Sequence, residues 1–487
     1  MYAEQQHYDC VRRIIYKWCA KTQNAKFVLT FHGVKSLSIW HRSEKRKNLY
    51  DIFLQNDIKY LLLQLYYSRE KDIHVSTEIK YREMKTTPYY ILWALLALLA
   101  LPMSAQTEPE SSDSSATRHF VHQLMFDYRP GAILHTNDFL RGKNPEVRTM
   151  NHDMGYYLKY AFSAPEDSEQ ASIYRDAYQG VGIGWNEFNP QLGNPVSVFV
   201  LQGARIASLS DRLSFNYEWN LGLTFGWNPY DAESNPDNKL IGSRVTAYIG
   251  LDMYMRWIAS RHVDINLGFN VTHYSNGNTQ FPNLGLNTLA LRIGAAYYIN
   301  RHTPRLLYRH TPVPPVRHDI TCDLILYGAW HQRGFYDYDG NAYIFPEKFA
   351  VAGFNFNPMY RFNHWLKAGI SLDGTYDRSS NIVIGDNPTD ETIVPLYSRP
   401  RSAWRQMALG ASARVEFCMP YFAINFGMGS NFLNATDDFH GIYELLALKL
   451  NITRRLLLHV GYTLNDFHRP KHLMLGVGWR FGCLGRS

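Results

Sequence analysis

Residues 263–275 read VDINLGFNVTHYS, and this stretch decides the fold. Its odd positions from Val263 to Val271 are apolar, whereas its even positions from Asp264 to Thr272 are polar or glycine. Because successive side chains of a β-strand point to opposite faces, the stretch predicts a strand with one apolar and one polar face. In a membrane β-barrel the apolar row faces lipid and the polar row faces the lumen.

The same alternation recurs along the rest of the chain between loops rich in Gly, Asn, Asp and Pro. A first set of eight strands is predicted near 118–128, 154–163, 178–188, 195–206, 212–226, 242–258, 262–275 and 286–299. A second set of eight is predicted near 319–331, 347–360, 364–376, 403–418, 421–429, 440–452, 456–466 and 471–481. The fold class is therefore all-β, a transmembrane antiparallel β-barrel.

Residues 300–318 are Pro-rich and basic, which indicates an extended linker between the two sets of strands. Residues 246–275 align with residues 444–468, with Gly268 opposite Gly461, which indicates an internal duplication. The preferred architecture is two tandem eight-stranded barrels, over 106–299 and 319–487. A single barrel of about sixteen strands is the alternative that the same alternation allows.

The composition agrees with a membrane barrel. Aromatic residues make up 15% of the chain, with 34 Tyr, 26 Phe and 11 Trp, and barrels use such residues as girdles at both membrane interfaces. After residue 120 no apolar run approaches the roughly 18 residues of a transmembrane helix. The five cysteines form no CxxC or His/Cys cluster, so neither a metal site nor a disulfide framework is indicated, and no motif points to nucleic acid.

A targeting segment precedes the first strands. Residues 84–105 carry a basic start at Lys85, an apolar run and the small residues Ser104 and Ala105. This pattern is typical of a secretory signal peptide cleaved near Ala105, and it predicts export to the outer membrane. Residues 1–83 are then a doubtful upstream extension; the alternative is a cytoplasmic extension whose apolar run is kept as a signal anchor.

Three polar residues lie at the rim where the strand 263–275 ends and the next strand begins. His273 and Ser275 continue its odd, lipid-facing row, and Asn287 begins the corresponding row of the next strand, at the same rim. A histidine beside a serine can act as general base while the hydroxyl attacks an ester, and a third group fixes the imidazole. The turn at Asn276–Asn278 would present N–H groups to an oxyanion. The alternative is that the strand leaves the hydrocarbon before His273, so that these residues only meet lipid headgroups.

The pattern HxSN followed by PNxGxN resembles the lipid A 3-O-deacylases of the PagL type, and the resemblance covers residues 118–299. The residues that carry it are His273, Ser275, Asn276, Pro282, Asn283, Gly285 and Asn287. The resemblance implies an outer-membrane barrel that removes the ester-linked acyl chain at the 3-position of lipid A. It also implies Ser275 as nucleophile, His273 as base, and Asn276 with the following backbone, including Asn278, as oxyanion hole. Asn287 stands where the best-known member has Glu.

The expected partners are lipid A or lipopolysaccharide as substrate, the surrounding outer-membrane lipids, and the barrel-assembly machinery during insertion. The expected chemistry, carboxylic ester hydrolysis, needs neither cofactor nor metal. The second set of strands lacks the motif, because Asp466 and His468 stand opposite His273 and Ser275. It is predicted to be a degenerate, catalytically silent barrel. A non-catalytic outer-membrane barrel with a structural or ligand-binding role is the alternative function.

Overall fold

The chain divides into two units, residues 1–102 and residues 103–487. The computed structural model describes residues 27–29, 37–39, 120–165, 168–302, 313–336, 342–385, 396–398, 402–434, 437–467 and 469–483. In the first unit these include a two-stranded antiparallel ladder of β1 (Phe27–Leu29) and β2 (Leu37–Ile39). The predicted signal peptide at 84–105 and the middle of the predicted linker, 303–312, lie outside the described residues.

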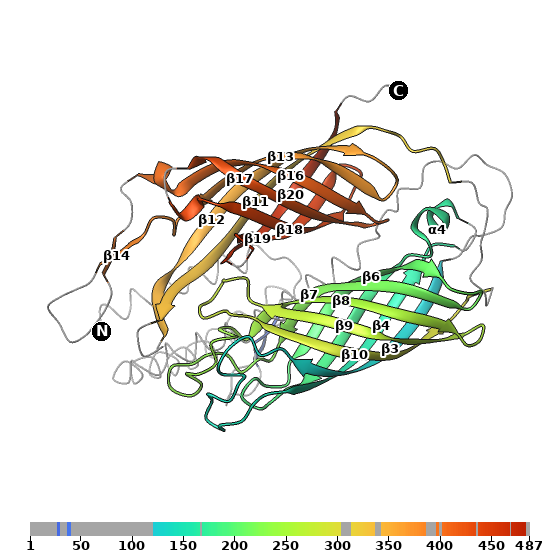
Figure 1. The fold of residues 1–487 in the computed structure, drawn as a ribbon, viewed down its shortest axis with the longest axis horizontal. Helices are drawn as coiled ribbons and strands as arrows, with labels where there is room; N and C mark the ends of the chain where they lie inside the picture. The colour runs from blue at the N-terminus through green and yellow to red at the C-terminus, as the bar shows by residue number, and fades with distance from the viewer. Residues whose placement is uncertain are drawn as a thin grey trace, which may run out of the picture. The chain divides into compact units, whose positions relative to one another are not determined.

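The second unit holds two closed barrels, whose strands are drawn as arrows in Figure 1. The first barrel consists of β3 (Val121–Ile133), β4 (His152–Ser163), β5 (Tyr178–Glu187), β6 (Val196–Ser208), β7 (Leu213–Phe225), β8 (Val245–Ile258), β9 (Val263–Ser275) and β10 (Leu286–Tyr298). Neighbouring strands in the chain pair antiparallel, and β10 returns to pair with β3. Because the barrel is closed, no strand of its wall is an edge strand.

The second barrel repeats this arrangement. It consists of β11 (Ile320–Tyr336), β12 (Ala342–Arg361), β13 (Leu366–Asp377), β16 (Met407–Cys418), β17 (Phe422–Asn434), β18 (Ile442–Asn451), β19 (Leu456–Asn465) and β20 (Arg469–Cys483). β20 closes the barrel by pairing with β11. The prediction of two tandem eight-stranded barrels is confirmed, and the alternative of a single barrel of about sixteen strands is wrong.

Short elements connect the strands. They are α4 (Glu169–Tyr174), η2 (Ala403–Gln406), η3 (Asp437–Phe439) and a small hairpin of β14 (Val383–Gly385) and β15 (Leu396–Ser398). Among the described residues no helix is both long and apolar enough to cross a membrane. Each barrel has an outer rim, defined as the end at which its seventh strand, β9 or β19, connects to its eighth strand, β10 or β20.

Tight turns at the opposite rim share one side-chain device. Ser210, Ser260 and Thr453 each accept hydrogen bonds from two following backbone N–H groups, at 2.9–3.3 Å. Such hydroxyl-to-backbone bonds satisfy amides that the ladder leaves free and therefore favour a turn. Ser260 and Thr453 precede the seventh strand of the first and second barrel, respectively. The alignment of 246–275 with 444–468 therefore superposes equivalent strands, as expected of a duplicated sequence.

The two faces of β9 are divided as the sequence predicts. Leu267, Phe269 and Val271 point outward and keep 49–62% of their surface exposed, whereas Asp264 and Thr272 point inward and are at most 1% exposed. This apolar exterior and polar interior is the reverse of a soluble barrel. It is the arrangement that a bilayer requires, because hydrocarbon replaces water around the wall.

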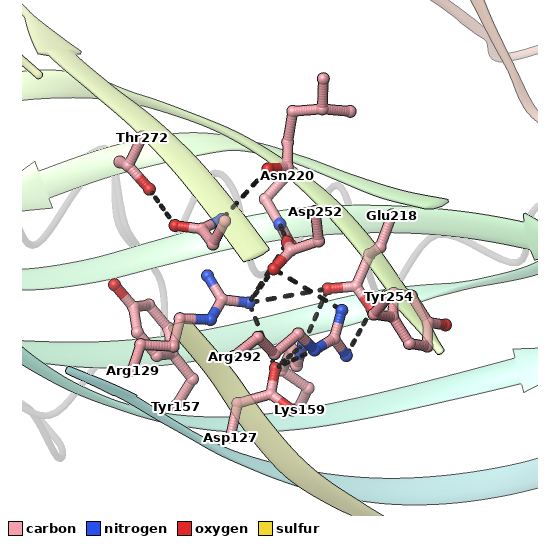
Figure 2. Close-up of polar contacts among 12 residues, drawn as sticks. Asp127, Arg129, Tyr157, Lys159, Glu218, Asn220, Asp252, Tyr254, Thr272 and Arg292 are labelled. Carbon is pink, nitrogen blue, oxygen red and sulfur yellow. Dashed lines mark hydrogen bonds and ion pairs between the residues drawn. The ribbon is translucent and has the colours of Figure 1, made fainter. Parts of the chain in front are cut away.

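The interior of the first barrel is filled by a compact ionic network (Figure 2). Six side chains, each at most 1% exposed, supply three cations and three carboxylates; they are Asp127, Arg129, Lys159, Glu218, Asp252 and Arg292. Arg292 reaches Asp127 at 3.1 Å and Glu218 at 3.3 Å, and Lys159 reaches Glu218 at 2.7 Å. Pairing every charge offsets the cost of burial and links five strands, β3, β4, β7, β8 and β10.

The second barrel has an interior network of the same kind on different residues. Lys449 lies 2.6 Å from Glu416 and 3.1 Å from Asp323, which Arg480 also contacts at 2.7 Å. Cys322 in this barrel is disulfide-bonded, whereas the sequence indicated no disulfide framework. The spacing of cysteines along a sequence does not reveal which of them come close enough to form a disulfide.

Candidate active site

The site lies on the hairpin formed by β9 and β10, at the outer rim. His273 and Asn287 are directly opposite each other in the ladder, and both side chains are half-buried on the outer face. His273 Nδ1 lies 2.7 Å from Asn287 Oδ1. Because an amide oxygen can only accept, the proton is on Nδ1 and His273 Nε2 is left as the basic nitrogen.

Ser275 lies two residues further along the same face and is also half-buried. Its Oγ accepts hydrogen bonds from the Asn283 amide at 2.9 Å and from the Gly277 backbone N–H at 3.1 Å. Within the described part of the chain no hydrogen bond joins Ser275 to His273. The structure therefore brings His273 to Asn287, and Ser275 to Asn283, on one surface.

The loop 276–285 is held by its own polar side chains. Asn276 N–H donates to Asn283 Oδ1 at 3.0 Å, and the Asn276 amide donates to the Gln280 carbonyl at 2.9 Å. Asn278 Oδ1 accepts from the Asn283 amide at 3.1 Å. The side chains of Asn276 and Asn278, predicted as oxyanion donors, thus have partners within the loop, and their role stays a prediction.

Asn283 is the residue whose contact sequence reasoning missed. It belongs to the PNxGxN pattern, but spacing alone does not show that its amide turns back across the loop toward Ser275. The turn that makes this possible has positive φ at Gly277 (63°) and Asn278 (62°), the conformation that glycine and asparagine tolerate best. The only sequence signal was therefore the Asn-Gly-Asn composition of the turn.

A neighbouring loop, residues 226–244, supports the hairpin from one side. The N–H groups of Leu284 and Gly285 donate to the carbonyls of Lys239 and Leu240, at 3.2 and 3.1 Å. A side chain at Gly242 would place its Cβ 2.2 Å from the Pro282 carbonyl, so only glycine allows this approach. In the same loop, backbone hydrogen bonds, first that of Ser234, hold the pKa of Asp231 below its usual value.

A glycine and a tyrosine set the orientation of the site residues. A Cβ at Gly285 would lie 2.9 Å from His273 Cε1, so the absence of a side chain there leaves room for the imidazole. Tyr274 points inward, is fully buried, and donates from its hydroxyl to Asn186 at 3.3 Å. With Tyr274 fixed in the interior, the alternation of the strand fixes His273 and Ser275 on the exterior.

The comparison with protein families agrees with this geometry. Residues 154–296 match the family model of the lipid A 3-O-deacylase (PagL), and residues 320–483 match that of the acyloxyacyl hydrolase, C-terminal domain. The first barrel is thus similar to the lipid A 3-O-deacylases (PagL), and the second barrel is similar to the C-terminal domain of acyloxyacyl hydrolase. The hairpin just described lies in the barrel that matches the lipid A 3-O-deacylase model. That the second barrel is a degenerate repeat of the first stays a prediction. The localisation in the outer membrane that the sequence predicted is that of the family.

Two solved structures are similar to part of this chain at low sequence identity. The outer membrane enzyme PagL is 12% identical, with a TM-score of 0.24 over 35% of this chain and 97% of that chain. Neisserial surface protein A is 10% identical, with a TM-score of 0.24 over 36% of this chain and 96% of that chain. No curated protein matches the chain.

Proposed function

We propose that the first barrel is a serine esterase that removes an ester-linked acyl chain from lipid A, as a 3-O-deacylase. The observation that carries the proposal is the hydrogen bond of 2.7 Å between His273 and Asn287 beside Ser275, on the outward face of the barrel. A base oriented by a third group next to a hydroxyl is the arrangement that activates a serine nucleophile.

In the proposed reaction Ser275 Oγ turns from the Asn283 amide toward His273 Nε2 and attacks the ester carbonyl of lipid A. His273 takes the hydroxyl proton and then gives it to the departing sugar oxygen, which leaves the acyl chain on Ser275. Water attacks this acyl ester while His273 takes one of its protons. The bond between the acyl carbon and Ser275 Oγ then breaks, His273 returns the proton to Oγ, and the fatty acid leaves. Asn287 keeps the proton of the imidazole on Nδ1 throughout.

The proposed oxyanion donors are the Asn283 amide and the Gly277 N–H. Both point at Ser275 Oγ, at 2.9 and 3.1 Å. The oxyanion forms on the carbon that becomes bonded to this Oγ, so it would lie close to the same two donors. Donors fixed in advance by a folded loop need no reorganisation as charge develops, which is the main source of their catalytic effect. Asn278 supports this role by holding the Asn283 amide.

The position of the site fits an acyl lipid as substrate. Val271 and Ile249, which flank His273 on the outer face, keep 49% and 36% of their surface exposed. The ester of a membrane lipid lies at the boundary between acyl chains and headgroups, where an apolar wall below the serine and a polar loop above it meet the two parts of the molecule. Burial of the acyl chain against this wall would contribute about 25 cal/mol per Å² of apolar surface.

The test is mass spectrometry of lipid A from Gram-negative cells that express the full chain, its Ser275→Ala variant and a control, Ser430→Ala. Ser430 is an exposed serine of the second barrel. The proposal expects the loss of one hydroxyacyl chain in cells with the native chain and the control, and intact lipid A with Ser275→Ala. Intact lipid A with a folded native chain, across several lipid A structures, would overturn it.

The alternative is a non-catalytic outer-membrane barrel that binds lipid or serves a structural role. It is favoured by the neutral Asn287, which lacks the charge of a carboxylate, and by the pairing of Ser275 with Asn283 rather than with His273. The two functions separate in a binding experiment. A silent barrel would bind lipid A without change in its mass, and Ser275→Ala would leave that binding unaltered.

A further inference from the structure

The second barrel has a ribbon that extends beyond its own wall. β11 pairs with β12 as far as Tyr336 and Ala342, but β20 pairs with β11 only up to Gly328, and β13 pairs with β12 only from Val351. Residues 329–336 and 342–350 therefore form a two-stranded ribbon with no further strand on either edge in the described structure. A two-stranded hairpin is marginally stable by itself, so this ribbon needs a contact surface.

Polar contacts join this ribbon to the loop 276–285 of the first barrel. Gln332 N–H donates to the Asn278 carbonyl at 2.9 Å, and Phe281 N–H donates to Gln332 Oε1 at 3.3 Å. The ladder register shifts between Gln332 and Gly334, so the Gln332 N–H is available outside the ribbon. The Gln332 amide also donates to the Phe345 carbonyl at 3.1 Å, which ties it to the opposite strand.

Aromatic packing accompanies these hydrogen bonds. The rings of Phe281 and Tyr336 lie 5.1 Å apart, and the Lys239 ammonium lies 5.0 Å from the centre of the Tyr336 ring. A Cβ at Gly334 would lie 2.5 Å from the Phe281 ring, so glycine is needed for this approach. The contact thus combines an apolar centre with hydrogen bonds at its side, as specific protein interfaces do.

The start of β20 reaches the same loop and leads to the nucleophile. The Asn278 amide donates to the Pro470 carbonyl at 2.9 Å, while Asn278 Oδ1 accepts from the Asn283 amide at 3.1 Å. The Asn283 amide also donates to Ser275 Oγ at 2.9 Å. Asn278 therefore connects the backbone of the second barrel, through one further side chain, to the serine of the first.

The strand topology of the two barrels agrees with these contacts. The loop 276–285, the end of β11 and the start of β20 all belong to outer rims. At the opposite rims Phe162 packs on Tyr421, and Trp219, midway along β7, packs on Phe422, with ring centres 6.0 and 5.4 Å apart. Contacts that join like ends are those required of two barrels that cross one bilayer in the same direction.

We propose that the ribbon of residues 329–336 and 342–350 and the start of β20 form a docking surface for the loop 276–285, and that they position Asn283 and Ser275 for catalysis. The second barrel then has a role in the reaction although it carries no nucleophile of its own. Gln332 and Asn278 are positioning residues, since they act through Asn283 and not on the substrate. This inference rests on the proposed esterase function.

The first test measures deacylation kinetics of Gln332→Ala in the full chain. Loss of the acceptor for Phe281 N–H loosens the loop, so kcat falls about tenfold while KM stays within about twofold, because donors to the oxyanion act in the transition state. Gln332→Glu keeps an oxygen acceptor and restores most of the rate. Lys348→Ala is the matched control, because exposed Lys348 pairs with Gln332 across the ribbon. A kcat of Gln332→Ala equal to that of the control would overturn the proposal.

The second test does not depend on activity. Cysteines at Phe281 and Tyr336, whose rings lie 5.1 Å apart, are joined by a short bis-maleimide in the outer membrane in a Cys418→Ser background, with Trp330→Cys as the control for Tyr336→Cys. A cross-link at 281–336 and none at 281–330 is the expected result. Cross-linking, with a native chain that leaves lipid A intact, would overturn the esterase and leave the docking surface in place. A native chain that deacylates lipid A, with no 281–336 cross-link in the folded double variant, would overturn the docking surface.

Discussion

The two barrels differ most in the connection between their seventh and eighth strands. In the first barrel β9 and β10 are joined by residues 276–285, which hold Ser275 by two hydrogen bonds. In the second barrel β19 ends at Asn465 and β20 begins at Arg469, and Asp466 between them accepts from the Ile442 N–H at the start of β18. The walls of the two barrels are alike, so the proposed chemistry depends on the connection and not on the barrel.

Replacing the connection between β9 and β10 by that between β19 and β20 is expected to have the largest effect. Replacing residues 276–285 by the turn of the second barrel removes Asn283 and Gly277, and we expect deacylation to fall by about 10⁴-fold, since neither oxyanion donors nor a held serine remain. The barrel itself should still fold, because β9 and β10 keep their pairing. Heat-modifiable migration on gels checks folding, and lipid A mass spectrometry checks activity. Retained deacylation would separate the chemistry from this loop.

Loss of the Asn283 amide is expected to have the next largest effect on the rate of deacylation. Asn283→Ala removes the amide that lies 2.9 Å from Ser275 Oγ, and we expect kcat to fall by about 10²–10³-fold, the effect of losing one oxyanion donor. Initial rates on lipid A vesicles measure it. The matched control is Asn465→Ala at the end of β19, whose amide donates to the His440 carbonyl. If both variants had the same rate, Asn283 would have no part in the reaction.

The interiors allow a comparison of stability. Lys159→Met leaves Asp127 and Glu218 buried with one cation fewer, and we expect a loss of about 3–5 kcal/mol in unfolding free energy. Lys449→Met should act likewise on the second barrel, where Lys449 bridges Asp323 and Glu416. Denaturant unfolding in vesicles measures both. Lys143→Ala, which breaks an exposed pair with Asp138, should leave stability unchanged. Equal effects for all three variants would contradict a structural role for the interior networks.

The sequence was sufficient to predict the barrel walls. Alternation such as that of Val263 to Val271 reports directly which side chains face lipid, so all sixteen barrel strands and the outward position of His273 and Ser275 were predicted. The same count placed Asn287 on the face and at the rim of His273, and the structure adds that the two residues are directly opposite in the ladder.

The parts that escaped prediction depend on contacts between distant segments. The approach of Gly242 to Pro282 and the turn of Asn283 back toward Ser275 arise from loop conformation, which has no period in the sequence. The ribbon of β11 and β12 was also missed, because both strands were predicted to end at the height of their neighbours. Alternation continues along a strand after its partners have ended, so it cannot report where the wall stops.

Substitution of Asn287 by Asp tests whether a carboxylate supports the proposed reaction better than the amide does. Asn287→Asp keeps the size of the side chain and places a negative charge beside His273 Nδ1, which lies 2.7 Å from the present amide oxygen. A charged acceptor strengthens such a bond by about 1 kcal/mol over a neutral one and stabilises the imidazolium, so kcat should rise about fivefold. Asn287→Ala should lower kcat by about tenfold, measured in the same vesicle assay. If Asn287→Asp and Asn287→Ala lowered kcat equally, the amide and not its oxygen would be what His273 requires, and the proton assignment on Nδ1 would have to be reversed.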